Sequence, residues 1–262
     1  MNQKFILAEY TVGTPAVIHP MKLLLVGDLH MNDYGDQNRE ILDACFEAAP
    51  DAVMCTGDMI NGSHPDETDT AVHFLRRLTE AAPVYAVNGN HETMVRDVPE
   101  AYRTYMRALA KSGVQVLNNR TYHVEIAGNP VSVTGIELPR SCYKKFRRHG
   151  ISEKALEKMI GTGPEQGTFS VLLAHNPYFA DSYFSWGADL ILSGHNHGGV
   201  MRFGDTKSLL SPYGYPLPKY GYGHFQKDDK HLIITSGLGE HTIPMRIHNP
   251  LEAVLICITP EI

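Results

Sequence analysis

The sequence predicts a layered α/β fold, and two observations support this prediction. Short apolar runs rich in β-branched residues are typical of strands that are buried on both faces. Such runs occur at residues 22–26, 52–56, 84–87, 131–135, 169–174, 189–193, 231–235 and 253–258. Amphipathic helical patterns separate the first runs, and this alternation predicts sheets that are covered by helices.

Four segments have the periodicity of helices. Residues 38–49 and 70–82 place apolar side chains three and four positions apart, on one helical face. A third helix is predicted to begin at Pro99, because proline suits the first turn, and to end at Gly113. A short fourth helix is predicted between a cap at Ser152 and Gly161. No repeat or linker interrupts these elements, so residues 1–262 are predicted to form one domain.

Composition excludes several classes of protein. A chain of 262 residues with 43% hydrophobic residues and a net charge of -6 is neither disordered nor marked by the charge pattern of a duplex nucleic-acid binder. Its apolar runs are far shorter than the ~20 residues of a membrane helix. The first twenty residues lack the pattern of a secretory signal, so we expect a cytoplasmic protein. The scattered Cys45, Cys55, Cys142 and Cys257 indicate reduced thiols rather than disulfides or a thiolate metal site.

Two segments are open to two interpretations each. Residues 202–230 are rich in Gly, Pro and Tyr, and so long a connection forms either a substrate wall or a structural surface loop. Its Tyr213, Tyr215, Tyr220 and Tyr222 either stack on a base or sugar or order their own loop. The basic run at 140–148 either meets a second phosphate or anionic head group or forms a solvated loop, and we favour the loop.

Metal-binding side chains directly follow five of the predicted strands. They are Asp28 and His30, then Asp58, then Asn90 with His91 and Glu92, then His175, and finally His195 and His197. In an open α/β sheet, ligands bind beyond the carboxyl ends of the strands, so these five ends are expected to converge on one crevice. Any one of these residues alone would be explained as a turn former or a helix cap, but together they indicate a site.

The donor set indicates the kind of metal. Two carboxylates, one amide oxygen and four imidazoles form a set of oxygen and nitrogen ligands that suits Mn, Fe or Zn. Seven ligands are enough for two divalent metal ions if one carboxylate bridges them. Two such ions contribute a charge of +4 and the two carboxylates contribute -2, so the site has a net positive charge. It is therefore expected to attract phosphate although the chain is acidic.

The order Asp-x-His, Gly-Asp, Gly-Asn-His-Glu, His and Gly-His-x-His resembles that of the calcineurin-like metallophosphoesterase superfamily. Residues 236–246 are similar to its bacterial branch of small phosphoesterases. The resemblance implies a four-layer αββα sandwich, in which two mixed β-sheets pack face to face between helices. It also implies that Asp28, His30, Asp58 and His197 hold one ion, that Asp58, Asn90, His175 and His195 hold the other, and that Asp58 bridges them.

Two departures from the family pattern bear on metal binding and on the substrate. Asn61 stands where many relatives have a second Asp, which is not usually a ligand. Val87 and Asn88 stand where protein Ser/Thr phosphatases of the superfamily place an Arg, which argues against a phosphoprotein substrate.

The leading functional hypothesis is a dinuclear metal-dependent phosphohydrolase that acts on a small phosphodiester or phosphomonoester. We expect a metal-bridging hydroxide to attack phosphorus directly and His91 to protonate the leaving oxygen as general acid. One alternative is a lipid-linked pyrophosphate hydrolase of the UDP-diacylglucosamine type, which would need an apolar groove near the crevice. A second alternative, a non-catalytic metal-binding interaction module, is opposed by the intact His91 and ligand set. His241 is a further candidate for lining the pocket.

Overall fold

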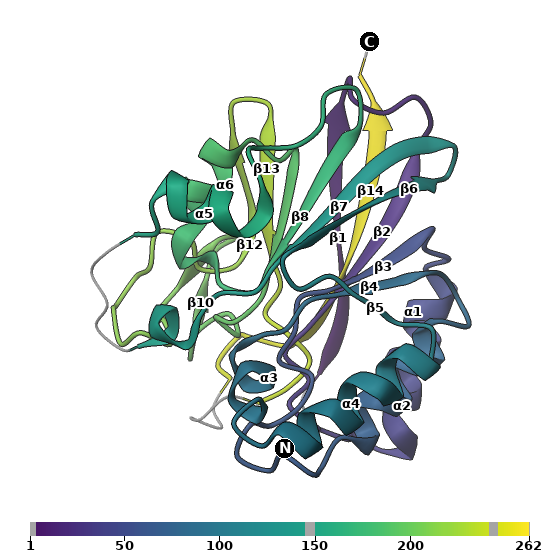
Figure 1. Ribbon diagram of the computed structural model, residues 1–262, viewed down its shortest axis with the longest axis vertical. Helices are drawn as coiled ribbons and strands as arrows, with labels where there is room; N and C mark the ends of the chain where they lie inside the picture. Colours follow the sequence, from purple (N-terminus) through teal and green to yellow (C-terminus); the bar gives the residue numbers. More distant parts are fainter. Residues whose placement is uncertain (1–3, 145–149, 241–245, 262) are drawn as a thin grey trace.

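Two six-stranded mixed β-sheets form the centre of the computed structural model, which describes residues 4–144, 150–240 and 246–261 (Figure 1). The first sheet has the strand order β1-β14-β2-β3-β4-β5, with β1 (Phe5–Thr14), β14 (Leu251–Pro260), β2 (Met21–Val26), β3 (Ala52–Cys55), β4 (Val84–Ala86) and β5 (Gln115–Val116). The second has the order β12-β13-β9-β8-β7-β6, with β12 (Gly223–Lys227), β13 (Lys230–Ile234), β9 (Leu190–Ser193), β8 (Phe169–Ala174), β7 (Asn129–Ile136) and β6 (Arg120–Ile126). A small separate ribbon pairs β10 (Arg202–Phe203) with β11 (Lys207–Ser208).

Helices cover the outer face of each sheet (Figure 1). The first sheet carries α1 (Arg39–Glu47), α2 (Asp69–Leu78) and α4 (Pro99–Lys111), and the second carries α5 (Glu153–Ile160) and α6 (Ala180–Trp186). Four short segments lie in the connections: α3 (Asn90–Val95) and the 3₁₀ turns η1 (Asp36–Asn38), η2 (Arg140–Tyr143) and η3 (Pro177–Phe179). The predicted four-layer αββα sandwich is therefore confirmed.

The alternation of side chains along a strand explains the layers. In β2, Leu24 and Val26 pack toward α1 and α2, whereas Leu23 and Leu25 join the cluster between the two sheets. In β8, Leu172 packs with α6 on the other face of the second sheet. Strands with apolar residues on both faces are thus covered by other layers on both faces, as their continuous apolar runs predict.

Most of the predicted elements are present, with small changes at their ends. The predicted helix 70–82 is wrong at its end, since α2 stops at Leu78, and strand β7 is longer than the predicted 131–135. The segment 202–230 is not one long loop, because it contains β10, β11 and β12. Strand β1 pairs with β14 over ten residues, which joins the two ends of the described chain in one sheet. The single domain stays a prediction.

The remaining expectations concern membranes and thiols. In residues 4–144, 150–240 and 246–261, every helix is too short or too polar to cross a membrane. Cys45, Cys55 and Cys142 are buried and no disulfide joins the cysteines of this part of the chain, in agreement with reduced thiols. The cytoplasmic location stays a prediction.

Candidate metal centre

The connections that follow β2 and β3 run side by side and bring their polar residues together. The backbone N–H of Asp28 donates to the carbonyl of Gly57 at 2.8 Å, and the N–H of His30 donates to the carbonyl of Asp58 at 3.0 Å. This ladder continues the parallel pairing of β2 with β3 beyond the ends of both strands. The two loops therefore hold Asp28, His30 and Asp58 at one edge of the first sheet.

The second sheet supplies its residues at the same place. The backbone N–H of His195, which follows β9, donates to both carboxylate oxygens of Asp28, at 3.1 and 3.0 Å. His175, which follows β8, reaches the first sheet through its ring Nδ1, 2.8 Å from the carbonyl of Thr56. The predicted convergence of strand ends is thus what the structure has.

Five of the seven predicted ligands have a left-handed backbone. The φ angles are 53° at Asp28, 49° at His30, 53° at Asp58, 68° at His195 and 48° at His197. Residues other than glycine rarely adopt this conformation, and Asp and His tolerate it better than β-branched residues do. The strand ends therefore turn at the ligand residues themselves and aim their side chains into one space.

Some of the glycines beside the proposed ligands leave room for a neighbouring carboxylate to approach the backbone closely. A Cβ on Gly89 would lie 2.1 Å from Asp58 Oδ1, and a Cβ on Gly194 would lie 2.4 Å from Asp28 Oδ2. Only Gly57 among the glycines that precede these ligands has a positive φ, of 91°. Two of these four glycines, Gly89 and Gly194, therefore make room for a carboxylate, and only Gly57 provides a turn that needs a positive φ.

The side chains form two groups that could each hold a cation. In the first, His30 Nε2 and His197 Nε2 face each other at 3.1 Å, and His197 Nε2 lies 3.5 Å from Asp28 Oδ1. In the second, His195 Nδ1 lies 3.2 Å from His175 Nε2, which is 3.1 Å from Asp58 Oδ2.

Asn90 and Asp58 complete this arrangement. The amide oxygen of Asn90 lies 3.3 Å from His175 Nε2, so Asn90 belongs to the second group. Asp58 Oδ1 accepts the backbone N–H of His91 at 2.8 Å. Its Oδ2 lies 3.9 Å from His30 Nε2 and 3.1 Å from His175 Nε2, so one oxygen faces both groups. This is the position that a bridging carboxylate needs.

Hydrogen bonds to the outer ring nitrogens set the tautomers of two histidines. His175 Nδ1 donates to the Thr56 carbonyl, and His197 Nδ1 lies 3.3 Å from the Gly239 carbonyl. When these two rings are neutral, their Nε2 lone pairs consequently point into the shared space, as metal ligation requires. The donor set and its orientation fit a pair of divalent cations.

The charges of the buried groups are strongly coupled. Burial raises the pKa of Asp28 to about 7, and the nearby Asp58 carboxylate adds to this effect. Burial also acts on Asp58, but His175 and His91 more than offset it and hold the Asp58 pKa well below its usual range. The pKa of His175 is raised to about 9 because the attraction of Asp58 outweighs the effect of burial. The site thus keeps Asp58 ionised and compensates it with a neighbouring ring.

His91 stands beside these groups in a different environment. A ring nitrogen of His91 lies within 4.8 Å of ligand atoms of His30 and Asp58, close enough to offer a ligand itself. Its Nδ1 accepts the backbone N–H of Gly62 at 2.9 Å, so the proton of the neutral ring resides on Nε2. Unlike the buried His175, His91 is half-exposed.

Glu92 supports the site from outside the predicted ligand set, a role that its position after a strand did not predict. Its buried carboxylate accepts four backbone N–H groups: those of Met59 and Ile60 on Oε1, at 2.8 and 3.3 Å, and those of Asp58 and Gly89 on Oε2, both at 2.9 Å. It thereby ties the loop of Asp58 to the start of α3, where Asn90 lies. The signal for this role was an acidic residue three positions after the helix cap Gly89, the spacing of a capping box.

Arg246 is a second residue to which no role was assigned. Its guanidinium donates to the carbonyls of Pro250 at 3.1 Å, Ser236 at 3.0 Å and Gly239. The Gly239 carbonyl is the one that faces His197 Nδ1, so Arg246 supports that ring through the intervening loop. No local pattern in the sequence indicates this long-range contact.

Other candidates lie apart or outside the described chain. Of the basic run, Arg140 is exposed and pairs with Asp97, whereas residues 145–149 lie outside the described residues. His241 also lies outside them. In the segment 202–230, Tyr222 is buried and its hydroxyl donates to the Gly204 carbonyl, which is a structural role.

Comparison with known proteins agrees with this geometry. Residues 21–199 match the model of the calcineurin-like phosphoesterase family, so the chain belongs to this family and is a metal-dependent phosphoesterase.

Relatives and solved structures extend the match over most of the chain. The chain is 27% identical to F40B5.2 of Caenorhabditis elegans, a protein named as a metallophosphoesterase, over 95% of this chain. The matched region spans only 54% of that protein. The chain is 25% identical to the phosphodiesterase YaeI of Escherichia coli, over 84% of this chain and 76% of YaeI. The crystal structure of TT1561 of Thermus thermophilus covers 84% of this chain and 91% of its own, with 13% identity and a TM-score of 0.51, and shows the same fold.

Proposed function

We propose that this chain is a dinuclear metal-dependent phosphohydrolase that cleaves a phosphodiester or phosphomonoester by direct attack of water on phosphorus, without a covalent enzyme intermediate. The observation that carries the proposal is that two pairs of facing histidine nitrogens share one nearby carboxylate oxygen. His30 faces His197 at 3.1 Å, His175 faces His195 at 3.2 Å, and Asp58 Oδ2 lies within 4 Å of one ring nitrogen from each pair.

The proposed ligands divide between two cations. Asp28, His30, Asp58 and His197 would hold the first, and Asp58, Asn90, His175 and His195 would hold the second. Oxygen and nitrogen donors without thiolate favour Mn, Fe or Zn. When bound, such a pair of cations supplies positive charge for the phosphate and lowers the pKa of a water that becomes the nucleophile.

His91 is proposed as the general acid that protonates the leaving oxygen. The Gly62 N–H on Nδ1 keeps the ring proton on Nε2, on the side of the ring that the Gly62 bond leaves available. The partial exposure of His91 allows a substrate oxygen to reach that proton. The Asp58 carboxylate accepts the His91 backbone N–H at 2.8 Å, which fixes the start of α3 relative to the ligands.

A small phosphodiester is the first substrate class to test, because the relative YaeI is named as a phosphodiesterase. The purified chain would be loaded with Mn, Fe or Zn and assayed against bis-p-nitrophenyl phosphate, p-nitrophenyl phosphate and a nucleotide panel. Hydrolysis that requires added metal supports the proposal. A chain that takes up metal but cleaves none of these esters would contradict it.

Asp58→Ala tests the bridge by elemental analysis. If Asp58 Oδ2 serves both cations, this variant loses both, whereas the control Asp66→Ala, at an exposed aspartate of the same loop, retains them. Retention of two ions by Asp58→Ala would assign the bridge elsewhere.

His91→Ala tests the acid with a series of leaving groups. Metal content is expected to persist, because His91 is outside the proposed ligand set. Activity should fall by about 10²–10⁴-fold on esters with alkoxide leaving groups and much less on p-nitrophenyl esters, which need no protonation. Equal losses on both, or loss of one metal ion, would assign His91 to another role. The exposed His64 serves as the control, as His64→Ala.

A further inference from the structure

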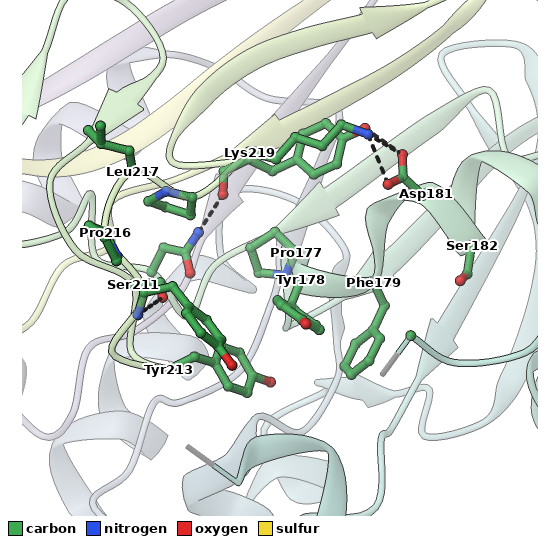
Figure 2. A pocket seen from close by; sticks show the side chains of 15 residues that line it. Pro177, Tyr178, Phe179, Asp181, Ser182, Ser211, Tyr213, Pro216, Leu217 and Lys219 are labelled. Carbon is green, nitrogen blue, oxygen red and sulfur yellow. Dashed lines mark hydrogen bonds and ion pairs between the residues drawn. The ribbon is translucent and has the colours of Figure 1, made fainter. Parts of the chain in front are cut away.

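A cavity of about 430 Å³ opens beside the candidate metal centre. Its walls come from η3 and the start of α6 on one side and from residues 211–220 on the other. Figure 2 shows Pro216 and Leu217 across from Tyr178 and Phe179, with Tyr213 at the base. The volume falls within the range of about 300–1,000 Å³ that is common for pockets of small organic ligands.

The cavity shares its walls with the metal centre. Asn196, between His195 and His197, lines it and donates through its amide to the carbonyl of Tyr220 at 2.7 Å. The ring of Tyr213 packs edge-on against the His195 ring, with centroids 5.9 Å apart. Asn196 and Tyr213 thus connect the cavity to the proposed ligands His195 and His197.

The lining is aromatic, and it carries no unbalanced charge among the described residues. The rings of Tyr178 and Tyr213 lie 4.8 Å apart, and Tyr215 and Tyr220 also line the walls. The charged residues of the rim cancel, because Lys219 Nζ binds both carboxylate oxygens of Asp181 at 2.7 and 2.9 Å. The described lining residues thus offer no surplus cation to a second phosphate, whereas a flat uncharged ring can stack on tyrosine faces.

We infer that this cavity binds the organic group of the phosphoester substrate, and that this group is an uncharged planar ring system such as a nucleobase. The inference rests on the proposed phosphohydrolase function and adds the substrate class. It gives the segment 211–220 the role of a substrate wall, with Tyr178 as the ring that contributes to specificity from the opposite side.

The test uses p-nitrophenyl diesters that share one leaving group and differ in the second substituent: methyl, octyl, phenyl and thymidine 5′-yl. Because the chemical step is the same, differences in kcat/KM report binding of the second substituent. The metal-loaded chain is expected to favour the phenyl and thymidine esters over the methyl ester by about tenfold or more. An octyl ester that is cleaved best would show that the cavity takes an alkyl chain and overturn the inference, as would equal rates for all four esters.

Two variants test whether the cavity residues produce this preference for ring-bearing esters. Tyr178→Leu removes a planar face and should reduce the preference for phenyl and thymidine esters over the methyl ester by about fivefold or more. Leu217→Asn changes a cavity residue that is 64% exposed and has a positive φ, which Asn tolerates, so it should fold and reduce the same preference. The control Tyr122→Leu, on edge strand β6, should leave the preference intact.

A binding measurement separates this inference from the proposed function. Ligand-observed NMR with adenosine needs neither metal nor turnover, because the cavity is built by the chain itself. Binding that weakens in Tyr178→Leu but not in Tyr122→Leu supports the cavity even if no ester is cleaved. Absence of adenosine binding together with active but unselective hydrolysis would refute the cavity and leave the phosphohydrolase intact.

Discussion

Glu92 offers the sharpest test of how the chain holds its proposed ligands. Glu92→Gln keeps the shape of the side chain but replaces one carboxylate oxygen, which accepts two backbone N–H groups, by an NH₂ group that cannot accept them. Each buried donor left without an acceptor costs about 1–3 kcal/mol, so the free energy of unfolding should fall by about 2–6 kcal/mol. For a chain of this size, a loss near 4 kcal/mol lowers the Tm by about 8–16 °C.

The measurement is thermal unfolding, combined with metal content after loading. The control is Glu47→Gln, the same substitution at an exposed position at the end of α1, which should change the Tm by little. Because Glu92 receives the N–H of Asp58, the variant should also retain less metal than the wild type. A Glu92→Gln variant with the Tm and metal content of Glu47→Gln would refute the reasoning that this carboxylate ties the two loops together.

Two further predictions concern buried polar contacts elsewhere. Arg246→Lys loses the forked contacts with several carbonyls, including that of Gly239, and should lower the Tm by about 4–8 °C in a calorimetric scan, whereas the exposed Arg107→Lys should not. Burial and its histidine partner on β13 lower the pKa of His224, so its stabilising contribution is present above the unfolded value of 6.5 and is lost as pH falls through the folded pKa. In urea titrations at pH 7.5 and 5.5, His224→Gln should therefore lose less stability on acidification than the wild type or His64→Gln, and an equal loss would count against this account.

Local patterns predicted the strands that are buried on both faces and missed those at the edges. Strand β8 begins and ends where its apolar run predicts, because every residue of it is buried. Strand β6 was missed because it is an edge strand whose mostly exposed residues include Arg120 and Glu125. Strand β5 has two residues, too few for any period to appear. Burial on both faces thus left a signal in the sequence that edge strands lack.

The candidate site was also predicted only in part: the sequence predicts which side chains meet, but not the contacts that orient them. The order of polar residues after strands predicts which side chains converge, since parallel strand ends share one edge of a sheet. The contacts that orient them depend on residues far apart in the chain, as with the Gly239 carbonyl at His197 or the Thr56 carbonyl at His175. Those contacts use backbone atoms, which every residue type possesses. Side-chain identity therefore could not reveal them.

The geometry of the ligands explains why so much of the surrounding structure is devoted to backbone contacts. Five of the proposed ligand residues have a left-handed backbone, a conformation that costs roughly 1–2 kcal/mol per residue for most L-amino acids. The carboxylates of Asp28 and Asp58 are also buried close to one another. Both costs are present before any cation binds, and the hydrogen bonds of Glu92, of the loops after β2 and β3, and of the His195 N–H offset them in the chain itself. The chain is therefore built to hold the proposed ligands in place in advance, and we expect residues beyond the proposed ligands to affect metal affinity.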